Sequence, residues 1–595
     1  MCGIAGLITS PAKPLPISEL SDRINAMQAA LVHRGPDHQA IYLSASGNAA
    51  ICHTRLAVID ISAKANQPMT SEDGRYTLSF NGEIYNHKKL RLGLEERGAK
   101  FKSKSDSEVV LKLLIEKGTK GLKLLRGMFA IALWDEKQQS LLLARDPQGI
   151  KPLYYCVRKD TLGFASEVRA LLKAQLSSGK LSSRGINQYL LRGSFSEPDT
   201  AFTDIKLLPA GTFFEWQEGR PKLQRYWKPS FKVNQSMTRE RAIEVTRDNL
   251  EHSVKAHLVS DVPVGLFLSG GIASSALLAI ATQLTSKKIN TYSIAFEDKQ
   301  WNEGQIEKRT AQHFGCKHTE WQINSTQAQD LFKDFLKCVD QPTTGGFNSY
   351  CVAKLASENG EKVILSGLGA DELFAGHSSF KKLPSFKSKA QNLKWLSFIL
   401  APCRDLIDRL STEQGRRILD ILYHPQSMPI LHQSFRGIFS LSEARYLAQK
   451  LTGKESHASY HKLRAKNTLD QISELELSVY CRNQPLRESD IFSMAFGLEL
   501  RVPFIDKVMI EQLLTIPKRW RLELDKKLLI DSVPELPKWI LEHPKQEFRL
   551  PFDDWLKEEL NTMPIKTNPE NITLESWSRR WSLAALEDWL ERHAS

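Results

Sequence analysis

Runs that alternate apolar and polar residues dominate the first quarter of the 595-residue chain. Alternation with a period of two is typical of half-buried strands, whereas apolar residues three or four apart are typical of an amphipathic helix. The pattern predicts strands at Ile4–Ile8, Ala49–Ile59, Tyr76–Phe80, Phe129–Trp134 and Ser140–Ala144. It predicts helices at Ser18–Val32 and Ser107–Lys117. We therefore expect an α+β domain at the start of the chain.

Beyond about residue 240 the strands are expected to be buried on both faces. Val262–Leu268 is continuously apolar, which is typical of a strand in a parallel sheet covered by helices. Helices are predicted before and after it, at Arg241–Val259 and Ala276–Leu284. Further strands are predicted at Asn290–Phe296, Lys317–Gln322 and Lys362–Leu365. This alternation predicts a doubly wound α/β sheet with helical additions, and ligands at the carboxyl ends of its strands.

The change of pattern divides the chain into two predicted domains, residues 2–227 and 241–595, joined by a polar linker at 228–240. The region 381–470 is helical and basic, and we expect Arg416-Arg417 and Lys387-Ser388-Lys389 to lie on solvated faces. Near the end of the chain, tryptophans four residues apart predict a helix at Glu575–Arg592 that packs in a core.

Composition restricts the class of protein. Hydrophobic residues make up 41% and charged residues 25%, as in globular proteins, and no apolar run is long enough to cross a membrane. No secretory signal is visible and the eight cysteines form no CxxC pair, so we expect a reduced, cytoplasmic setting. The net charge of +13 is spread along the chain without an aromatic-basic module. We expect no nucleic-acid partner, and a positive surface that either attracts anionic substrates or simply keeps the protein soluble.

Cys2 is the first candidate for chemistry. An initiator methionine before a small residue is usually removed, which would leave a thiol and a free α-amine on one residue. The amine titrates near pH 8 and can accept the thiol proton, so Cys2 would carry both a nucleophile and its base. The alternative is an ordinary cysteine that happens to lie near the terminus.

Polar clusters between the predicted strands of the first domain have simple structural explanations when taken singly. Asn81-Gly82 is a common hairpin turn, Ser105-Asp106 could cap a helix, and Arg55 could be a surface charge. The full set comprises His33–Asp37, His53–Leu56, Asn81–Asn86, Lys104–Asp106 and Arg145–Tyr155.

Behind Cys2 and in this order, the clusters resemble the N-terminal-nucleophile glutamine amidotransferases over the whole first domain. The resemblance implies a four-layer αββα sandwich in which Cys2 attacks glutamine and releases ammonia. It implies that the Asn81 side chain and the Gly82 N–H stabilise the oxyanion, a role worth about 3–4 kcal/mol per donor. It also implies that Arg55 binds the α-carboxylate of glutamine, while Glu83 and Asp106 bind its α-ammonium.

The second domain contains a Ser-Gly-Gly-Ile-Ala-Ser-Ser sequence at 269–275, directly after an apolar strand and before a helix. Backbone N–H groups, serine hydroxyls and the helix dipole at such a turn can bind a phosphate. The sequence is not a Walker motif, which would need GxxxxGK[ST]. Further polar clusters follow at Ser366–Gly376, Asp490–Ala495, Leu498–Asp506 and Lys545.

This series resembles the synthetase domain of the glutamine-dependent (class B) asparagine synthetases, and with the first domain the resemblance spans nearly the whole chain. It implies an ATP pyrophosphatase-type domain that adenylates a carboxylate, releases diphosphate and lets ammonia displace AMP. It implies Mg²⁺ on Asp371, Lys545 facing the phosphates, and a possible homodimer. The implied ATP contacts are Leu268, Ser269, Gly270, Gly271, Ser274, Ser275, Ile294, Ser366, Gly367 and Lys545.

Two departures from the family pattern leave the acceptor open. Ala273 stands where the family usually has an aspartate that binds magnesium, and Leu368 stands where asparagine synthetases have an acidic residue. Aspartate is the first expected acceptor. The alternatives are another carboxylate, in a natural-product or surface-polysaccharide pathway, or a glutaminase attached to an inactive synthetase-like scaffold.

Overall fold

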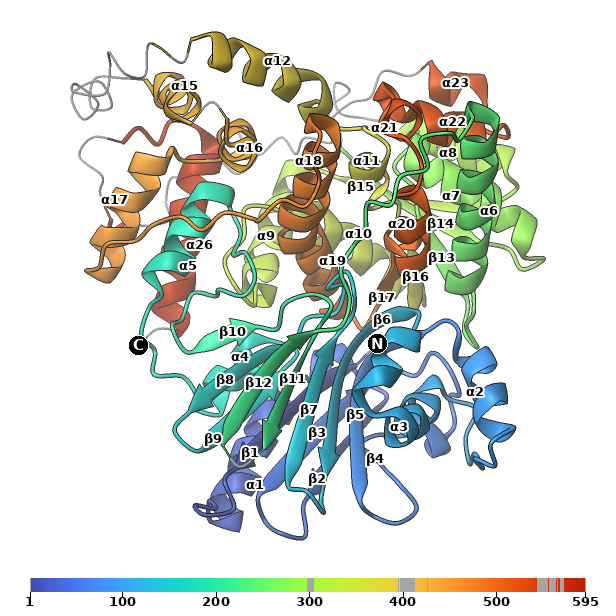
Figure 1. Ribbon diagram of the computed structural model, residues 1–595, viewed down its shortest axis with the longest axis vertical. Coiled ribbons are helices and arrows are strands. Elements are labelled where there is room, and N and C mark those ends of the chain that lie inside the picture. Colours follow the sequence, from blue (N-terminus) through green and yellow to red (C-terminus); the bar gives the residue numbers. More distant parts are fainter. Residues whose placement is uncertain are drawn as a thin grey trace.

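Three β-sheets organise the computed structural model (Figure 1). The two sheets built by the first part of the chain lie in the lower half of the view, and the third lies among the helices above them. The structure describes residues 2–217, 219–296, 304–393, 395, 412–424, 426–542, 555, 563, 565–567 and 572–593. The predicted ATP contact Lys545 lies outside this part of the chain.

Two six-stranded antiparallel sheets form the first part of the structure. The first has the order β10-β8-β9-β1-β3-β2, with β1 Gly3–Thr9, β2 His38–Leu43, β3 Ala49–Arg55, β8 Tyr154–Arg158, β9 Thr161–Ala165 and β10 Ile205–Leu207. The second has the order β12-β11-β7-β6-β5-β4, with β4 Met69–Thr70, β5 Tyr76–Ile84, β6 Gly127–Asp135, β7 Ser140–Arg145, β11 Thr212–Gln217 and β12 Arg220–Arg225.

The alternation of side chains along β1 and β6 explains how these sheets pack. Ile4 and Ile8 of β1 join one apolar cluster with Trp134 of β6, so this cluster lies between the two sheets. The residues that alternate with these along each strand face helices instead. Those of β1 pack with α1 (Ile17–Ala29), and those of β6 pack with α3 (Asp106–Lys117).

The third sheet is parallel, with the order β15-β14-β13-β16-β17. The chain runs outward from β13 to β15 and then returns to the other side of β13, so the order reverses between β13 and β16. Ligands bind at such switch points, beyond the carboxyl ends of the strands. The strands are β13 Val264–Phe267, β14 Asn290–Phe296, β15 Lys317–Ile323, β16 Val363–Leu365 and β17 Glu499–Arg501.

Further helices complete both parts of the structure. Those before residue 379 are α2 His87–Glu95, α4 Val168–Lys173, α5 Ser183–Arg192, α6 Arg239–His257, α7 Ile272–Leu284, α8 Gly304–His313, α9 Ser325–Cys338, α10 Phe347–Glu358 and α11 Ala370–Leu373. Later ones are α12 Ser379–Asn392, α15 Glu413–Tyr423, α16 Met428–Arg436, α17 Leu441–Thr452, α18 Thr468–Leu475, α19 Pro485–Met494, α20 Lys507–Leu513, α21 Lys518–Arg521, α22 Lys527–Ser532, α23 Lys538–Leu541 and α26 Trp577–His593. Within the described ranges, no helix combines the length and apolarity needed to cross a membrane.

The predicted elements exist, with differences at their ends. The strand expected at Ala49–Ile59 stops at Arg55, and helix α6 begins at Arg239, two residues inside the predicted linker. Thr238 caps that helix by accepting a hydrogen bond from Arg241 N. The prediction lacks strand β17 and also β2, β4 and the five strands β8 to β12 of the first domain.

The prediction of solvated arginines in the helical region is wrong for Arg416. Its side chain is buried on α15 and pairs with Glu443 of α17 at 2.5 Å. Glu443 also accepts from Arg579 of the C-terminal helix α26, at 2.9 Å. Trp581 and Trp589 of α26 are buried, as predicted. The carboxylate of Glu443 therefore joins two helices that lie far apart in sequence.

A fully buried ion cluster connects the two parts of the chain. Arg34 donates from Nη1 to Glu167 at 2.8 Å and from Nη2 to Asp490 of α19 at 2.8 Å. Lys151 pairs with the other oxygen of Asp490 at 3.1 Å. Removing one partner from a buried ion pair leaves an uncompensated charge in a medium of low dielectric constant.

We expect Asp490→Asn to destabilise the protein by about 3–5 kcal/mol, because Arg34 and Lys151 lose a shared counter-charge. Chemical denaturation measures the change. Asp160→Asn is the matched control, since Asp160 forms an exposed pair with Lys13 and its loss should leave the denaturation midpoint unchanged. Equal midpoints for Asp490→Asn and the wild type would contradict the prediction.

Candidate active sites

Cys2 lies directly before the central strand β1, and its backbone is held on both sides. Its N donates to Asn81 Oδ1 at 3.0 Å, and its carbonyl oxygen accepts from Arg34 Nε at 3.2 Å. Arg34 is the same residue that pairs with Asp490, so the placement of Cys2 depends on the ion cluster. Burial raises the pKa of the Cys2 thiol.

Asn81 and Gly82 lie in the middle of β5, opposite Ala130 and Phe129 of β6, so they do not form a hairpin turn. Asn81 is fully buried, and its Nδ2 has no hydrogen-bond acceptor among the residues that the structure describes. A Cβ on Gly82 would lie 2.1 Å from the carbonyl oxygen of Met128, so only glycine fits there. The strand thus presents an unused N–H donor beside the Cys2 backbone.

Every residue that the sequence assigned to the glutaminase site lies near the Cys2 thiol. One small pocket is lined by Cys2, Arg55, Gly82, Glu83 and Asp106, and Asn81 is hydrogen-bonded to Cys2. Apolar walls are supplied by Leu56, Val58, Ile59, Ala65 and Phe80.

Hydrogen bonds fix Arg55 to a loop and Asp106 to the end of strand β5. Arg55 is buried, not a surface charge, and its Nη1 donates to Ser62 O at 2.9 Å and to Asn66 Oδ1 at 2.7 Å. Asp106 is the first residue of α3, and its carboxylate accepts from Ile84 N at 2.8 Å. Ser105, the residue before it, does cap the helix.

The synthetase half contributes to this pocket through β17. Arg501 Nη2 lies 3.8 Å from Glu83 Oε1, and Arg501 Nε pairs with Glu499 at 2.6 Å. Burial raises the pKa of Glu83 well above its usual range, and the charges of Glu499 and Asp106 raise it further. Sequence reasoning placed Glu499 and Arg501 in a motif without assigning them a role, because nothing in the sequence shows that β17 ends beside Cys2.

A second cavity, of about 650 Å³, lies at the switch point of the parallel sheet. Most of the predicted ATP contacts line it: Leu268, Ser269, Gly270, Gly271, Ser274, Ile294, Ser366 and Gly367. Asp371, the predicted magnesium ligand, lines it as well. Ser275 does not, because its side chain is fully buried within α7.

The turn after β13 has the geometry of an anion-binding loop. Gly270 has a positive φ of 65°, and Gly271 is the N-cap of α7. Ser274 Oγ accepts from Ser269 N at 3.2 Å and donates to Gly271 O at 3.2 Å. The N-terminus of α7 therefore opens into the cavity beside a closed turn, where its free N–H groups favour negative charge.

The far side of the cavity carries charged groups that sequence reasoning did not identify. Lys526 donates to Asp371 Oδ1 at 2.7 Å and adopts a left-handed backbone, with φ 60°. Arg436 of α16 stacks on Tyr480 at 3.7 Å and pairs with Glu476 at 2.7 Å. A lysine or arginine is too common in a basic chain for its position alone to reveal such a role. Both departures noted in the sequence, Ala273 and Leu368, line the same cavity.

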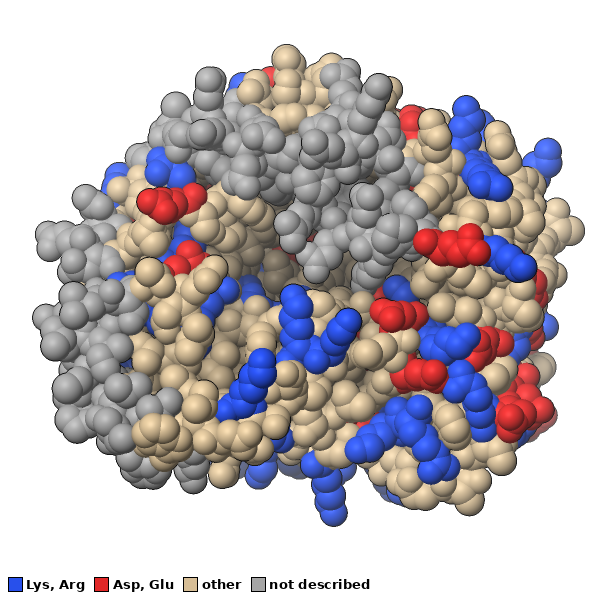
Figure 2. Space-filling model, turned by 90° about the horizontal axis from the view of Figure 1, so that it is seen from above, with Lys and Arg blue, Asp and Glu red and all other residues tan. Residues whose placement is uncertain are grey.

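The charged surface does not alter this assignment. On the face seen from above, Lys and Arg are distributed among tan and acidic residues instead of forming one continuous patch (Figure 2). Most of the predicted site residues line the two pockets instead.

Together, the fold and the sites define a glutamine amidotransferase joined to a synthetase, and comparisons with known proteins agree. Residues 1–227 match the glutamine amidotransferase domain family, and residues 245–591 match the asparagine synthase family. The chain belongs to the glutamine-hydrolysing (class B) asparagine synthetase family, whose members are ATP-using ligases.

Similarity to individual relatives extends over much or all of the chain. It is 30% identical to asparagine synthetase [glutamine-hydrolyzing] 1 of Bacillus subtilis, over 99% of this chain and 93% of that protein. It is 31% identical to asparagine synthetase B of Escherichia coli, over 65% of this chain and 66% of that protein. It is also 28% identical to amidase chry2 of Gibberella zeae, over 64% of this chain and 60% of that protein.

Replacing Glu499 tests whether β17 acts on the Cys2 thiol. The negative charge of Glu499 raises the pKa of Cys2, so we expect Glu499→Gln to lower that pKa and shift thiol alkylation to lower pH. The rate of iodoacetamide labelling of the Cys2 peptide, followed against pH by mass spectrometry, measures the shift. Glu136→Gln, remote from the pocket, should not move the profile; a shift to higher pH in Glu499→Gln would refute the coupling.

Proposed function

We propose that this chain is a glutamine-hydrolysing asparagine synthase, which converts aspartate, glutamine and ATP into asparagine, glutamate, AMP and diphosphate. One observation carries the proposal. Glu499 and Arg501 flank the glutamine pocket, while Leu500 between them lines the large cavity. A three-residue strand thus borders both sites, as sequential chemistry at two centres requires.

In the first centre, Cys2 Sγ attacks the side-chain amide carbon of glutamine. The Asn81 Nδ2–H and the Gly82 N–H stabilise the oxyanion, and the α-amine takes the thiol proton and passes it to the leaving ammonia. Water then hydrolyses the thioester to glutamate. The buried, unused donor on Asn81 supports this role. Arg55 binds the α-carboxylate, and Glu83 with Asp106 binds the α-ammonium.

In the second centre, a carboxylate oxygen of aspartate attacks the α-phosphorus of ATP and diphosphate leaves. Ammonia then attacks the acyl carbon and AMP leaves, which completes the amide. The predicted nucleotide contacts are Leu268, Ser269, Gly270, Gly271, Ser274, Ser275, Ile294, Ser366, Gly367 and Lys545. The support is that eight of these ten line one cavity, around a turn suited to phosphate.

We propose that ammonia passes between the centres through apolar surroundings. Leu56 and Val58 line the glutamine pocket, whereas Leu268 and Leu500 line the large cavity. All four belong to one cluster of packed hydrophobic residues. Such an environment disfavours ammonium and leaves neutral ammonia, the reactive form, as the species that passes.

Magnesium would be held in part by Asp371. Mg²⁺ in nucleotide sites typically takes one or two carboxylates, with phosphate oxygens and water completing the octahedron. Asp371 fits as one such ligand because its carboxylate lines the cavity, although Lys526 already pairs with it at 2.7 Å. Ala273 supplies no second oxygen from the loop.

Leu368 favours a second candidate, amidation of a carboxylate other than aspartate. An apolar side chain lies in the cavity where the family has an acid, so it cannot bind an acceptor's ammonium group. Arg436 and His377 in the same lining can still bind an acidic group of the acceptor. The acceptor would then be an acid that lacks the α-ammonium.

The proposal also covers the domain boundaries, the location and the oligomeric state of the protein. We expect a four-layer αββα domain at 2–227, a linker at 228–240 and a synthetase domain at 241–595, in a cytoplasmic protein that forms homodimers. The packing of α1 and α3 on the outer faces of the two antiparallel sheets supports the layer order. We expect neither a nucleic acid nor a membrane as a partner.

Cys2→Ala tests the separation of the two centres. We expect it to reduce glutamine-dependent amide formation at least 1,000-fold, as loss of a nucleophile does, while leaving ammonia-dependent formation within about twofold. Product formation with glutamine or with ammonium chloride is measured in parallel. Equal loss with both nitrogen sources would contradict two separate sites.

Diphosphate exchange identifies the acceptor. We expect the enzyme to exchange labelled diphosphate into ATP when aspartate is present, because adenylation is reversible before ammonia arrives. Succinate, which lacks the ammonium group, and glutamate serve as comparison acids. Exchange with succinate alone would favour the second candidate, and no exchange with any acid would favour an inactive scaffold.

A further inference from the structure

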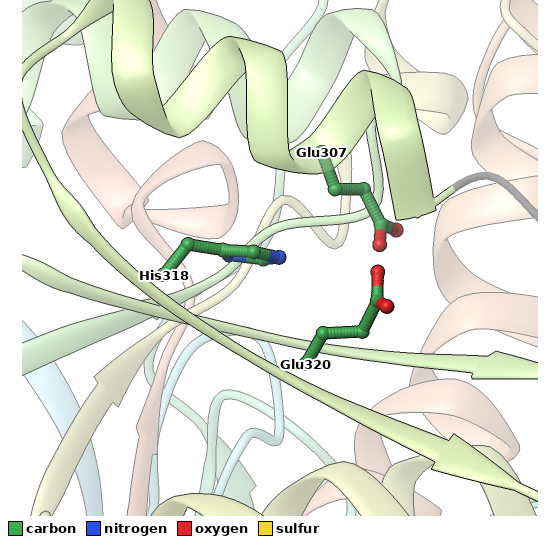
Figure 3. A group of neighbouring side chains, drawn as sticks. All are labelled: Glu307, His318 and Glu320. Carbon is green, nitrogen blue, oxygen red and sulfur yellow. The ribbon is translucent and has the colours of Figure 1, made fainter.

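Glu307, His318 and Glu320 form one group of ionisable side chains beside the large cavity (Figure 3). The ring nitrogens of His318 lie 2.9 Å from Thr291 Oγ1 and 3.2 Å from Ser293 Oγ, so hydroxyls of the neighbouring strand already contact both nitrogens. A different charged group, at the amino ends of β13 and β16, connects the parallel sheet to the glutamine pocket.

The loop that follows β3 forms one side of the glutamine pocket. Leu56, Val58 and Ile59 line the pocket, and the chain continues into Asp60. Asp261 N donates to Val58 O at 3.1 Å, and Asp261 Oδ2 accepts from Asp60 N at 2.8 Å. One residue of the synthetase half therefore holds the backbone of this loop at two points.

A second contact with the synthetase half holds the start of the same loop. Lys362 Nζ lies 3.0 and 2.9 Å from the two carboxylate oxygens of Asp37. Asp37 Oδ2 in turn accepts from Ala57 N at 2.7 Å. The loop is thus connected to the synthetase half at both its start and its middle.

Both contacts lie at the same edge of the parallel sheet. Asp261 comes shortly before β13 and Lys362 directly before β16, and these two strands pair side by side. Beyond their carboxyl ends lie Ser269 and Ser366, which line the large cavity. The same two strands therefore hold the glutamine loop at one end and the predicted nucleotide contacts at the other.

Asp60 connects Asp261 to the groups that are predicted to bind glutamine. Its backbone is left-handed, with φ 49°, a conformation that a residue other than glycine keeps only where its surroundings hold it. Its carbonyl oxygen accepts from Arg55 Nη2, and its carboxylate accepts from Lys104 N at 2.6 Å. Asp60 thus contacts both the Arg55 side chain and the segment that leads to Asp106.

The placement of the Arg55 guanidinium decides how well it can bind a carboxylate. An arginine binds a carboxylate through two parallel hydrogen bonds, so a displacement of about 0.5 Å is enough to weaken the pair. Since Asp60 O is one of the acceptors that hold Arg55, a change in the Asp60 backbone moves the guanidinium.

We propose that Asp261 is a positioning residue for the glutamine pocket: by holding the backbone of Asp60, it places the Arg55 guanidinium to bind the α-carboxylate of glutamine. The inference rests on the proposed glutaminase roles of Arg55 and Cys2. Asp261 acts through Asp60 and makes no bond to the substrate. Because it belongs to the synthetase half, the affinity of the pocket for glutamine depends on the amino end of β13.

A diazoketone analogue of glutamine tests the role of Asp261. 6-Diazo-5-oxo-L-norleucine carries the α-carboxylate and α-ammonium of glutamine and alkylates the Cys2 thiol, whereas iodoacetamide alkylates the thiol without either group. We expect Asp261→Ala to lower the second-order rate of labelling by the analogue about three- to tenfold, the effect of one hydrogen bond, and to leave the iodoacetamide rate unchanged. Mass spectrometry of the Cys2 peptide, after labelling of the full-length protein, measures both rates.

Steady-state kinetics gives a second measurement on the same variant. The KM for glutamine should rise by the same factor in Asp261→Ala, with kcat for glutamine hydrolysis within about twofold of the wild type, because the lost contact affects binding and not the attack by Cys2.

Two control variants show whether the hydrogen bond itself matters. Asp261→Asn keeps an oxygen that can accept from Asp60 N, so we expect labelling by the analogue within about twofold of the wild-type rate. Asp330→Ala removes an exposed carboxylate on α9 and should change neither rate. Unchanged labelling by the analogue in Asp261→Ala overturns the inference, as does an equal fall with both reagents, which would indicate a general disturbance of the pocket.

Arg55→Ala separates this inference from the proposed function. Slower labelling by the analogue in Arg55→Ala, with unchanged labelling in Asp261→Ala, would leave the glutamine site standing and reject the positioning role. A wild-type protein that the analogue does not label would remove both. The expected fall in Asp261→Ala, in a protein that exchanges no diphosphate with any acid, would support the positioning role while the synthase proposal fell.

Discussion

The guanidinium of Arg34 is the constraint on which the rest of the structure depends. It is fully buried, and its three nitrogens bond to the Cys2 carbonyl, to Glu167 and to Asp490. A buried arginine is tolerated only when its charge and hydrogen bonds are matched, so none of these partners can move alone. Because Asp490 belongs to α19 of the synthetase half, the contacts that hold Cys2, the proposed nucleophile, depend on packing between the two halves.

Strand β17 makes the dependence reciprocal. Ser366 N, at the predicted ATP site, donates to the backbone carbonyl of Arg501 at 2.9 Å, and the Arg501 side chain reaches toward Glu83. Its Nη1 is anchored on the carbonyls of His257 and Val259 at 2.6 and 2.7 Å. A shift of β17 on nucleotide binding would therefore move the Arg501 side chain relative to Glu83 in the glutamine pocket. Such coupling would prevent the release of ammonia before an activated acyl group is present to receive it.

Sequence reasoning recovered what is encoded locally. Period and turn composition indicated strands of both domains and the turn at Ser269, because each is specified by neighbours in the chain. The residues of the Cys2 pocket came from the resemblance to glutamine amidotransferases, since they lie far apart in the sequence. Sequence reasoning assigned no role to Arg501 and did not identify Lys526, because their contacts depend on how distant segments pack. It also placed Arg416 in solvent, since a pattern of charges does not reveal that Glu443 and α26 cover it. Such ion pairs form only when segments far apart in the chain fold against each other, so no single segment predicts them.

The glutamine pocket holds more negative charge than its own arginine balances. Glu83, Asp106 and Glu499 are all buried near Cys2, whereas Arg501 pairs closely with only one of them. Burial and mutual repulsion raise the pKa of Glu83 and of Asp106, which means that both carboxylates gain from a cation placed between them. In the proposed glutamine site, the α-ammonium of a free amino acid would supply that cation, and a glutamine within a peptide chain would not. Selectivity for free glutamine would then follow from an excess of negative charge that the substrate itself neutralises.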